Sequence, residues 1–179
     1  MPNILQELLN SLFKGFTNKA SYPTTSKVEP QINPKEAVID PYHRWTKGEL
    51  RHLSQHVKTV EVECHRCSLG SPQKISKEVL SKFEKLRTLY GKPIRITSGY
   101  RCLEHNRLIG SSDSSQHPKA EALDIQPLQF NTVKDLEELY KCCEKIFKAI
   151  GDARYRSPTL LKNFIHVDSR NDRVYRWKY

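Results

Sequence analysis

The sequence predicts an α+β domain in which helices pack on a small, mainly antiparallel sheet. Two long segments, 76–90 and 131–150, repeat apolar residues at helical spacing. Short runs with the alternation or β-branched content of strands occupy 94–97, 122–126, 164–168 and 173–177. Because helices and strands are mixed along the chain, helices that cover one small sheet would bury both kinds of apolar face.

The first long helix has recognisable end signals. Ser76 is placed to cap its N-terminus, and Gly91 follows Tyr90 where a left-handed C-cap favours glycine. Its expected apolar stripe consists of Val79, Leu80, Phe83, Leu86 and Leu89. A short helix is expected over 101–109, closed by Gly110.

The second long helix is expected over 131–150. Its buried side is predicted to carry Val133, Leu136, Leu139, Tyr140, Cys143, Ile146, Phe147 and Ile150. The remaining segments, 94–97, 122–126, 164–168 and 173–177, then supply the strands of the sheet.

The chain before this region divides into two further parts. Residues 1–16 place apolar side chains on one face of an expected amphipathic helix, which could dock on the domain, on a protein partner or on a membrane surface. Residues 17–44 are rich in Pro, Ser, Thr and Lys and are predicted to be a linker. The folded domain is therefore expected over 45–179, starting near Trp45.

Charge and hydropathy narrow the possible partners and location. The net charge of +10 favours anionic partners such as the bacterial wall, but the basic residues are dispersed, which argues against specific nucleic-acid recognition. No apolar run is long enough for a transmembrane segment. The first residues lack the basic leader of a secretory signal peptide. We therefore expect a protein that is cytoplasmic at synthesis and acts on a cell wall after release from a phage-infected or bacterial cell, or one that is associated with a virion.

The five cysteines cannot all pair within one chain, and reduced thiols are expected. Cys64 and Cys67 form a single Cys-x-x-Cys motif. A zinc site there would need two more ligands, for which Cys102, Cys142 and Cys143 are distant candidates. Buried or unpaired thiols are the favoured interpretation.

Three potential metal ligands fall on separate predicted elements. His117 ends a Ser-rich loop, Asp124 lies on the strand 122–126, and His166 lies on the strand 164–168. Two imidazoles and one carboxylate suit Zn²⁺ and leave a fourth position for water, as a catalytic site requires. On spacing alone, a histidine paired with an aspartate in a polar core is the favoured alternative.

The surrounding motifs favour the zinc site over a histidine–aspartate pair in the core. Their order along the chain is Ser98-Gly99-Tyr100-Arg101, Asn106, Ser115-x-His117-x-x-Ala120-x-Ala122-x-Asp124-Ile125, Phe164-Ile165-His166-Val167-Asp168 and Trp177. Together, over roughly 45–179, they resemble the zinc D-alanyl-D-alanine carboxypeptidase family of peptidoglycan peptidases. That family shares its fold with D-Ala-D-Ala dipeptidases, phage endolysin peptidases and the Hedgehog signalling domain.

The resemblance implies roles for individual residues. His117, Asp124 and His166 would bind zinc, and Arg101 would hold a substrate carboxylate or carbonyl oxygen beside it. Ser115 would hydrogen-bond the substrate backbone. Apart from the resemblance, Tyr100, Trp45 and Trp177 are candidates to line the cleft, although core packing is the more common role of large aromatic side chains. The implied activity is hydrolysis of D-Ala-containing peptide bonds in peptidoglycan stems or cross-links by metal-activated water.

Two positions depart from the family pattern. Ala120 stands where many relatives have glycine, a small change that we expect to be tolerated. Asn163 stands where several relatives carry the acidic general base, and an amide cannot accept a proton from water at neutral pH. Asp168 or Asp152 are the candidates to replace it, and Asp168 is also a candidate to orient His166 or the substrate. The alternative is an inactive zinc-holding module that binds wall peptide or a protein partner.

Overall fold

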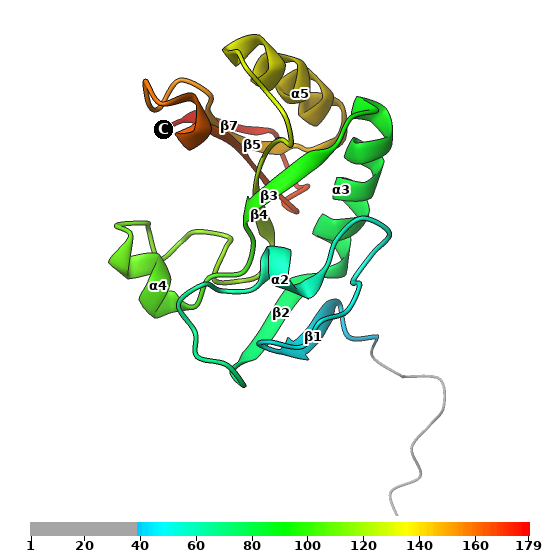
Figure 1. Ribbon diagram of the computed structural model, residues 1–179, viewed down its shortest axis with the longest axis vertical. Helices are drawn as coiled ribbons and strands as arrows, with labels where there is room; N and C mark the ends of the chain where they lie inside the picture. Colours follow the sequence, from blue (N-terminus) through cyan, green and yellow to red (C-terminus); the bar gives the residue numbers. More distant parts are fainter. Residues whose placement is uncertain (1–38) are drawn as a thin grey trace, which may run out of the picture. The chain divides into compact units, whose positions relative to one another are not determined.

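The computed structural model describes residues 39–179, and Figure 1 shows their arrangement. The helix predicted for 1–16 and the linker residues before 39 lie outside the described residues. The elements are β1 (Tyr42–Thr46), α2 (Thr59–Val62), β2 (Pro72–Ser76), α3 (Lys77–Tyr90), β3 (Ile94–Ser98), α4 (Leu103–Leu108), β4 (Ala122–Pro127), α5 (Val133–Ile146), β5 (Ala149–Ala153), a 3-10 turn (Leu160–Lys162), β6 (Phe164–Asp168) and β7 (Tyr175–Lys178). No helix in this part of the chain is long and apolar enough to cross a membrane.

The main sheet has the strand order β3-β4-β6-β5-β7. All neighbouring pairs are antiparallel except β5 and β7. A separate antiparallel pair joins β1 to β2. The α+β class, with helices on a mainly antiparallel sheet, is therefore confirmed.

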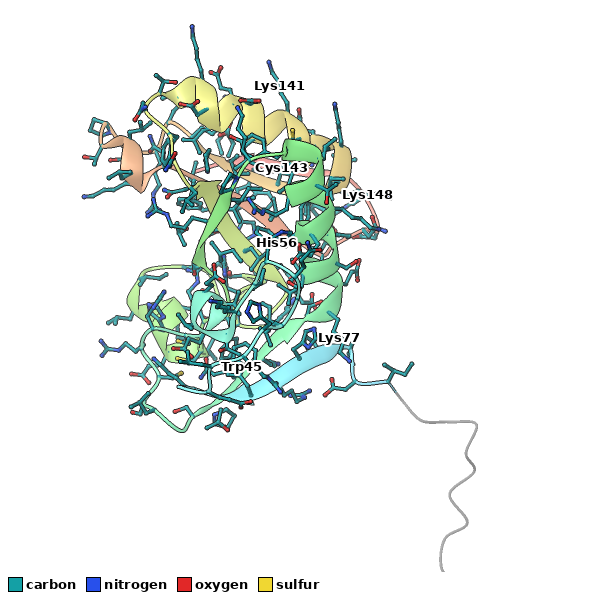
Figure 2. All side chains as sticks on the ribbon, turned by 45° about the vertical axis from the view of Figure 1, so that its right-hand side comes forward. Trp45, His56, Lys77, Lys141, Cys143 and Lys148 are labelled. Atoms are coloured by element: carbon teal, nitrogen blue, oxygen red, sulfur yellow. The ribbon has the colours of Figure 1, made fainter. Side chains whose placement is uncertain are left out.

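Side-chain alternation gives the sheet two different faces. Leu123, Ile165 and Ile150 are fully buried in the hydrophobic core that α3 and α5 complete. Figure 2 shows α3 and α5 meeting beside this core, where Cys143 is fully buried while Lys141 extends outward. Successive residues of a strand point to opposite faces, so Asp124 and His166 lie on the face that these helices do not cover.

Helix α3 matches its predicted boundaries. The Ser76 hydroxyl accepts hydrogen bonds from the backbone N–H groups of Glu78 and Val79, and Gly91 ends the helix at φ 68°. One position of the stripe was wrong, because Leu89 is 43% exposed and Tyr90 is buried in its place.

Helix α5 is shorter than predicted. It ends at Ile146, and Ile150 belongs to β5, a strand that the sequence analysis missed. Phe147 and Ile150 are both buried, so their apolar character fits the core whether the chain continues as a helix or turns into a strand. Elements β1, α2 and β2 were also missed; β1 begins at Tyr42, inside the range predicted to be a linker.

Candidate metal centre

The three predicted ligands converge on one face of the sheet. Asp124 on β4 and His166 on β6 are register partners, and His117 arrives from the loop before β4. Asp124 Oδ1 lies 2.9 Å from His166 Nδ1 and 3.2 Å from His117 Nε2. The two imidazole nitrogens are 3.2 Å apart, and all three residues are buried. Groups far apart in the sequence thus form one compact set of potential metal ligands.

The backbone of Gly99 orients His117. The Nδ1–H group donates to the Gly99 carbonyl at 2.7 Å, so the Nε2 lone pair faces Asp124 and His166. Gly99 approaches α2 so closely that a Cβ atom there would lie 2.6 Å from Val62 Cα. The glycine of the SGYR motif therefore allows the close approach that positions this carbonyl.

Asp168 orients His166 from behind. Its Oδ2 atom lies 3.4 Å from His166 Nε2, the nitrogen that faces away from the other ligands. Arg170 holds the Asp168 carboxylate with Nε at 2.9 Å and Nη2 at 2.7 Å. A carboxylate behind a ligating histidine fixes the tautomer and ring orientation.

The tautomers explain why a cation fits here. The Gly99 carbonyl requires a proton on His117 Nδ1, and Asp168 can accept one from His166 Nε2; with these tautomers the three facing atoms are all electron-pair donors. Such atoms repel one another unless a proton or a metal ion lies between them. Burial lowers the pKa of His117, which keeps it neutral as a ligand. Burial by itself would raise the pKa of Asp124. The combined opposite effect of His117 and His166 is larger and lowers this pKa, so the carboxylate stays ionised.

A cleft opens over this centre. It consists of two adjoining cavities of about 390 and 410 Å³ that share Gly110, Ser111 and Tyr179. Arg101 and Asp124 line the first cavity, and Ser115 and His166 line the second. The cleft is therefore large enough for part of a peptide beside the potential ligands.

Arg101 is poised at the bottom of the cleft. Its Nη2 lies 3.5 Å from Asp124 Oδ2, while its buried Nε has no hydrogen-bond partner. Burial lowers its pKa, but guanidinium groups stay charged near neutral pH. Tyr100, in contrast, packs against the hydrophobic core and does not line either cavity.

Two aromatic residues complete the site. The Trp177 ring lies 5.2 Å from the His166 ring, and Tyr179 lies 6.4 Å from it. Gly151 lies between His166 and Trp177 in the sheet register, and its lack of a side chain leaves room for the Trp177 ring. Sequence analysis missed Tyr179 as a site residue, although alternation from Trp177 places both residues on one face.

Asn163 and the two candidates for a general base, Asp152 and Asp168, all lie outside the cleft. Asn163 is buried and holds a loop through hydrogen bonds to the backbone of Ser157. Asp152 is one residue out of register with His166, so it points to the opposite face of the sheet, where Arg154 binds it. Asp168 lies behind His166. Among residues 39–179, Asp124 is the one carboxylate that lines the cleft.

A buried His-Asp-His set beside a cleft, on a helix-covered antiparallel sheet, is the architecture of a metallopeptidase-like protein. A family profile described as Peptidase M15 matches residues 51–168. The chain belongs to the M15 peptidase family, as the resemblance to D-Ala-D-Ala carboxypeptidases predicted. The match includes all three potential ligands together with Arg101 and Asp168. No curated protein matches the chain.

Proposed function

We propose that this protein is a zinc-dependent metallopeptidase that hydrolyses D-Ala-containing peptide bonds in peptidoglycan stems or cross-links. The observation that carries the proposal is the convergence of His117, Asp124 and His166 beside Arg101 at the bottom of the cleft. Their nitrogen and oxygen donors suit zinc, and three protein ligands leave a position open. The family membership supports the same chemistry.

The zinc ion and the side chains of the site would have different roles in catalysis. Zinc, when bound, supplies an ionised water at neutral pH and polarises the scissile carbonyl. The unpartnered Nε of Arg101 offers a donor for a substrate carboxylate or for negative charge that develops on the carbonyl oxygen. Ser115 lines the adjoining cavity, where its hydroxyl can hydrogen-bond the peptide backbone.

The charge of the cleft favours a wall peptide. Arg101 and Arg156 line the first cavity and Arg170 lines the second, whereas Asp124 is turned toward the histidines. A stem peptide that ends in a free carboxylate would meet guanidinium groups along this surface. We propose that the protein reaches the wall after release from a lysing cell, helped by its net charge of +10.

A second candidate function follows from the missing acidic base. If no side chain accepts the proton of the attacking water, the protein would hold zinc and bind wall peptide without turnover. The imidazole of His65 lines the first cavity, where its ring could accept this proton. His65→Gln tests whether His65 is the base. Loss of turnover with retained zinc and peptide binding would assign the proton transfer to His65, whereas a wild type without turnover would favour the inactive module.

The direct test is digestion of purified sacculi and defined muropeptides by the zinc-loaded full chain, with products identified by mass spectrometry. We expect new amino and carboxyl termini at bonds that involve D-Ala, and their loss in His117→Ala. Binding of muropeptides without cleavage would favour the second candidate. Equal product profiles for wild type and His117→Ala would refute the peptidase.

A further inference from the structure

A second cluster of potential metal ligands lies where α4 begins. The sulfur atoms of Cys64, Cys67 and Cys102 lie within 4.8 Å of one another. Cys64 and Cys67 belong to the loop between α2 and β2, whereas Cys102 is the N-cap of α4. The tertiary structure thus brings one distant candidate to the Cys-x-x-Cys motif, while Cys142 and Cys143 lie on α5.

A histidine lies beside one of these thiols. His105 Nδ1 lies 3.4 Å from Cys64 Sγ. In the sequence, Cys102 and His105 repeat the two-residue spacing of Cys64 and Cys67. Paired Cys-x-x-Cys and Cys-x-x-His segments are a common ligand arrangement of structural zinc sites.

The Cys64–Cys102 and Cys64–His105 distances match those of ligands that share one ion. Zn–S bonds of about 2.3 Å and Zn–N bonds of about 2.0–2.1 Å at tetrahedral angles separate two sulfurs by about 3.8 Å, and sulfur from nitrogen by about 3.6 Å. The Cys64 and Cys102 sulfurs are 3.8 Å apart. A disulfide would require about 2.05 Å, and every cysteine is a free thiol.

The backbone around the cluster is arranged to stabilise thiolates. The N–H of Cys102 donates to Cys64 Sγ at 3.4 Å, and the N–H of His105 donates to Cys102 Sγ at the same distance. Lys47 Nζ donates to the carbonyl oxygens of Cys64 and Cys67, each at 2.7 Å, and so closes the loop between them. These hydrogen bonds help to hold the loop in the shape that brings the thiols together.

We propose that Cys64, Cys67, Cys102 and His105 bind a structural zinc ion. Four protein ligands close the coordination sphere, in contrast to the centre at His117. Binding releases the thiol protons to solvent and leaves the oxidation states unchanged.

The ion would fix one wall of the cleft. Helix α4 buries only Asn106 among its side chains, and Leu108 and Ile109 are exposed, so packing alone holds it weakly. Figure 1 shows α4 on a side of the domain away from α3 and α5. Arg101 directly precedes Cys102, so an ion at Cys102 would anchor the backbone that carries this cleft residue.

Metal analysis of the full chain, purified under reducing conditions with zinc present, tests the proposal. Wild type should bind two zinc ions per chain, and His117→Ala and Cys67→Ser should each retain one. Cys142→Ser is the matched thiol control and should retain both. Cobalt-loaded His117→Ala should show intense thiolate-to-cobalt charge-transfer absorption, which Cys67→Ser should lack.

One measurement does not depend on the folding of a cysteine variant. A thiol-modifying reagent added to wild type should release one zinc, detected with a chromophoric chelator, and leave the ion at His117 in place. The proposal is overturned if His117→Ala binds no zinc, if the thiols react equally fast with and without zinc, or if the purified protein carries a Cys64–Cys102 disulfide. None of these readouts requires peptidase activity, so this inference and the proposed function can fail separately.

Discussion

The role of Asp168 can be tested by replacing it with asparagine. Asp168 is fully buried between His166 Nε2 and the guanidinium of Arg170. Oδ2 accepts from both His166 Nε2 and Arg170 Nη2, and Oδ1 accepts from Arg170 Nε, so an amide NH₂ group in place of either oxygen faces an Arg170 donor. In both orientations the negative charge behind His166 is lost. Removing a carboxylate behind a ligating histidine costs about 10–100-fold in metal affinity. This corresponds to about 1.4–2.7 kcal/mol.

The chain provides a matched control for this change. Asp152 binds Arg154 in the same Asp-x-Arg arrangement, with both distances 2.9 Å, but on the opposite face of the sheet. Asp152→Asn should therefore disturb a similar ion pair without affecting zinc. Competition with a chromophoric chelator gives the affinity of the His117 centre for each variant. Equal zinc affinities for the two variants would refute the assigned role of Asp168.

Three further predictions concern positions with specific geometric demands. Gly151→Ala places a Cβ atom 2.6 Å from the Trp177 ring, so we expect a loss of about 1–3 kcal/mol in urea unfolding and altered Trp fluorescence. Ala120 is buried at φ 67°, where a β-branched residue is strained; Ala120→Val should cost on the order of 2 kcal/mol while Ala120→Gly keeps near wild-type stability. Burial raises the pKa of Glu84, but hydrogen bonds from His56 and Ser54 outweigh it and lower the pKa below 4.5. The stability from this lowered pKa is present above pH 4.5 and is lost as the pH falls through the folded-state pKa, so the deficit of Glu84→Gln in thermal unfolding should shrink in acid.

Ala120 shows how a family pattern acquires a physical meaning. The sequence indicated only that alanine replaces a glycine common in relatives. The structure places this residue in the left-handed region, which glycine adopts without strain and alanine adopts at a modest cost. The expectation that alanine is tolerated is consistent with this backbone. The free-energy cost of alanine at this position arises from the positive φ angle and not from the size of the methyl group.

Local signals in the sequence were sufficient for several elements. The cap at Ser76, the glycine at 91 and the apolar period between them determined α3 almost to the residue. Alternation likewise located β4 and β6 and placed His166 on one face. The same reasoning extended α5 too far, because the apolar residues that follow Ile146 are buried equally well in β5.

The sequence by itself determined the residue types of the metal centre and their order, because side-chain chemistry and short-range period are local properties. Only the tertiary structure decided which nitrogen of each imidazole faces inward, that Asp168 rather than Asp152 stands behind His166, and that Cys102 meets Cys64. These outcomes depend on strand register and on the packing of segments far apart in the chain. Alternation places His166 on one face of its own strand, but only the pairing of the strands brings Asp124 and Gly151 beside it.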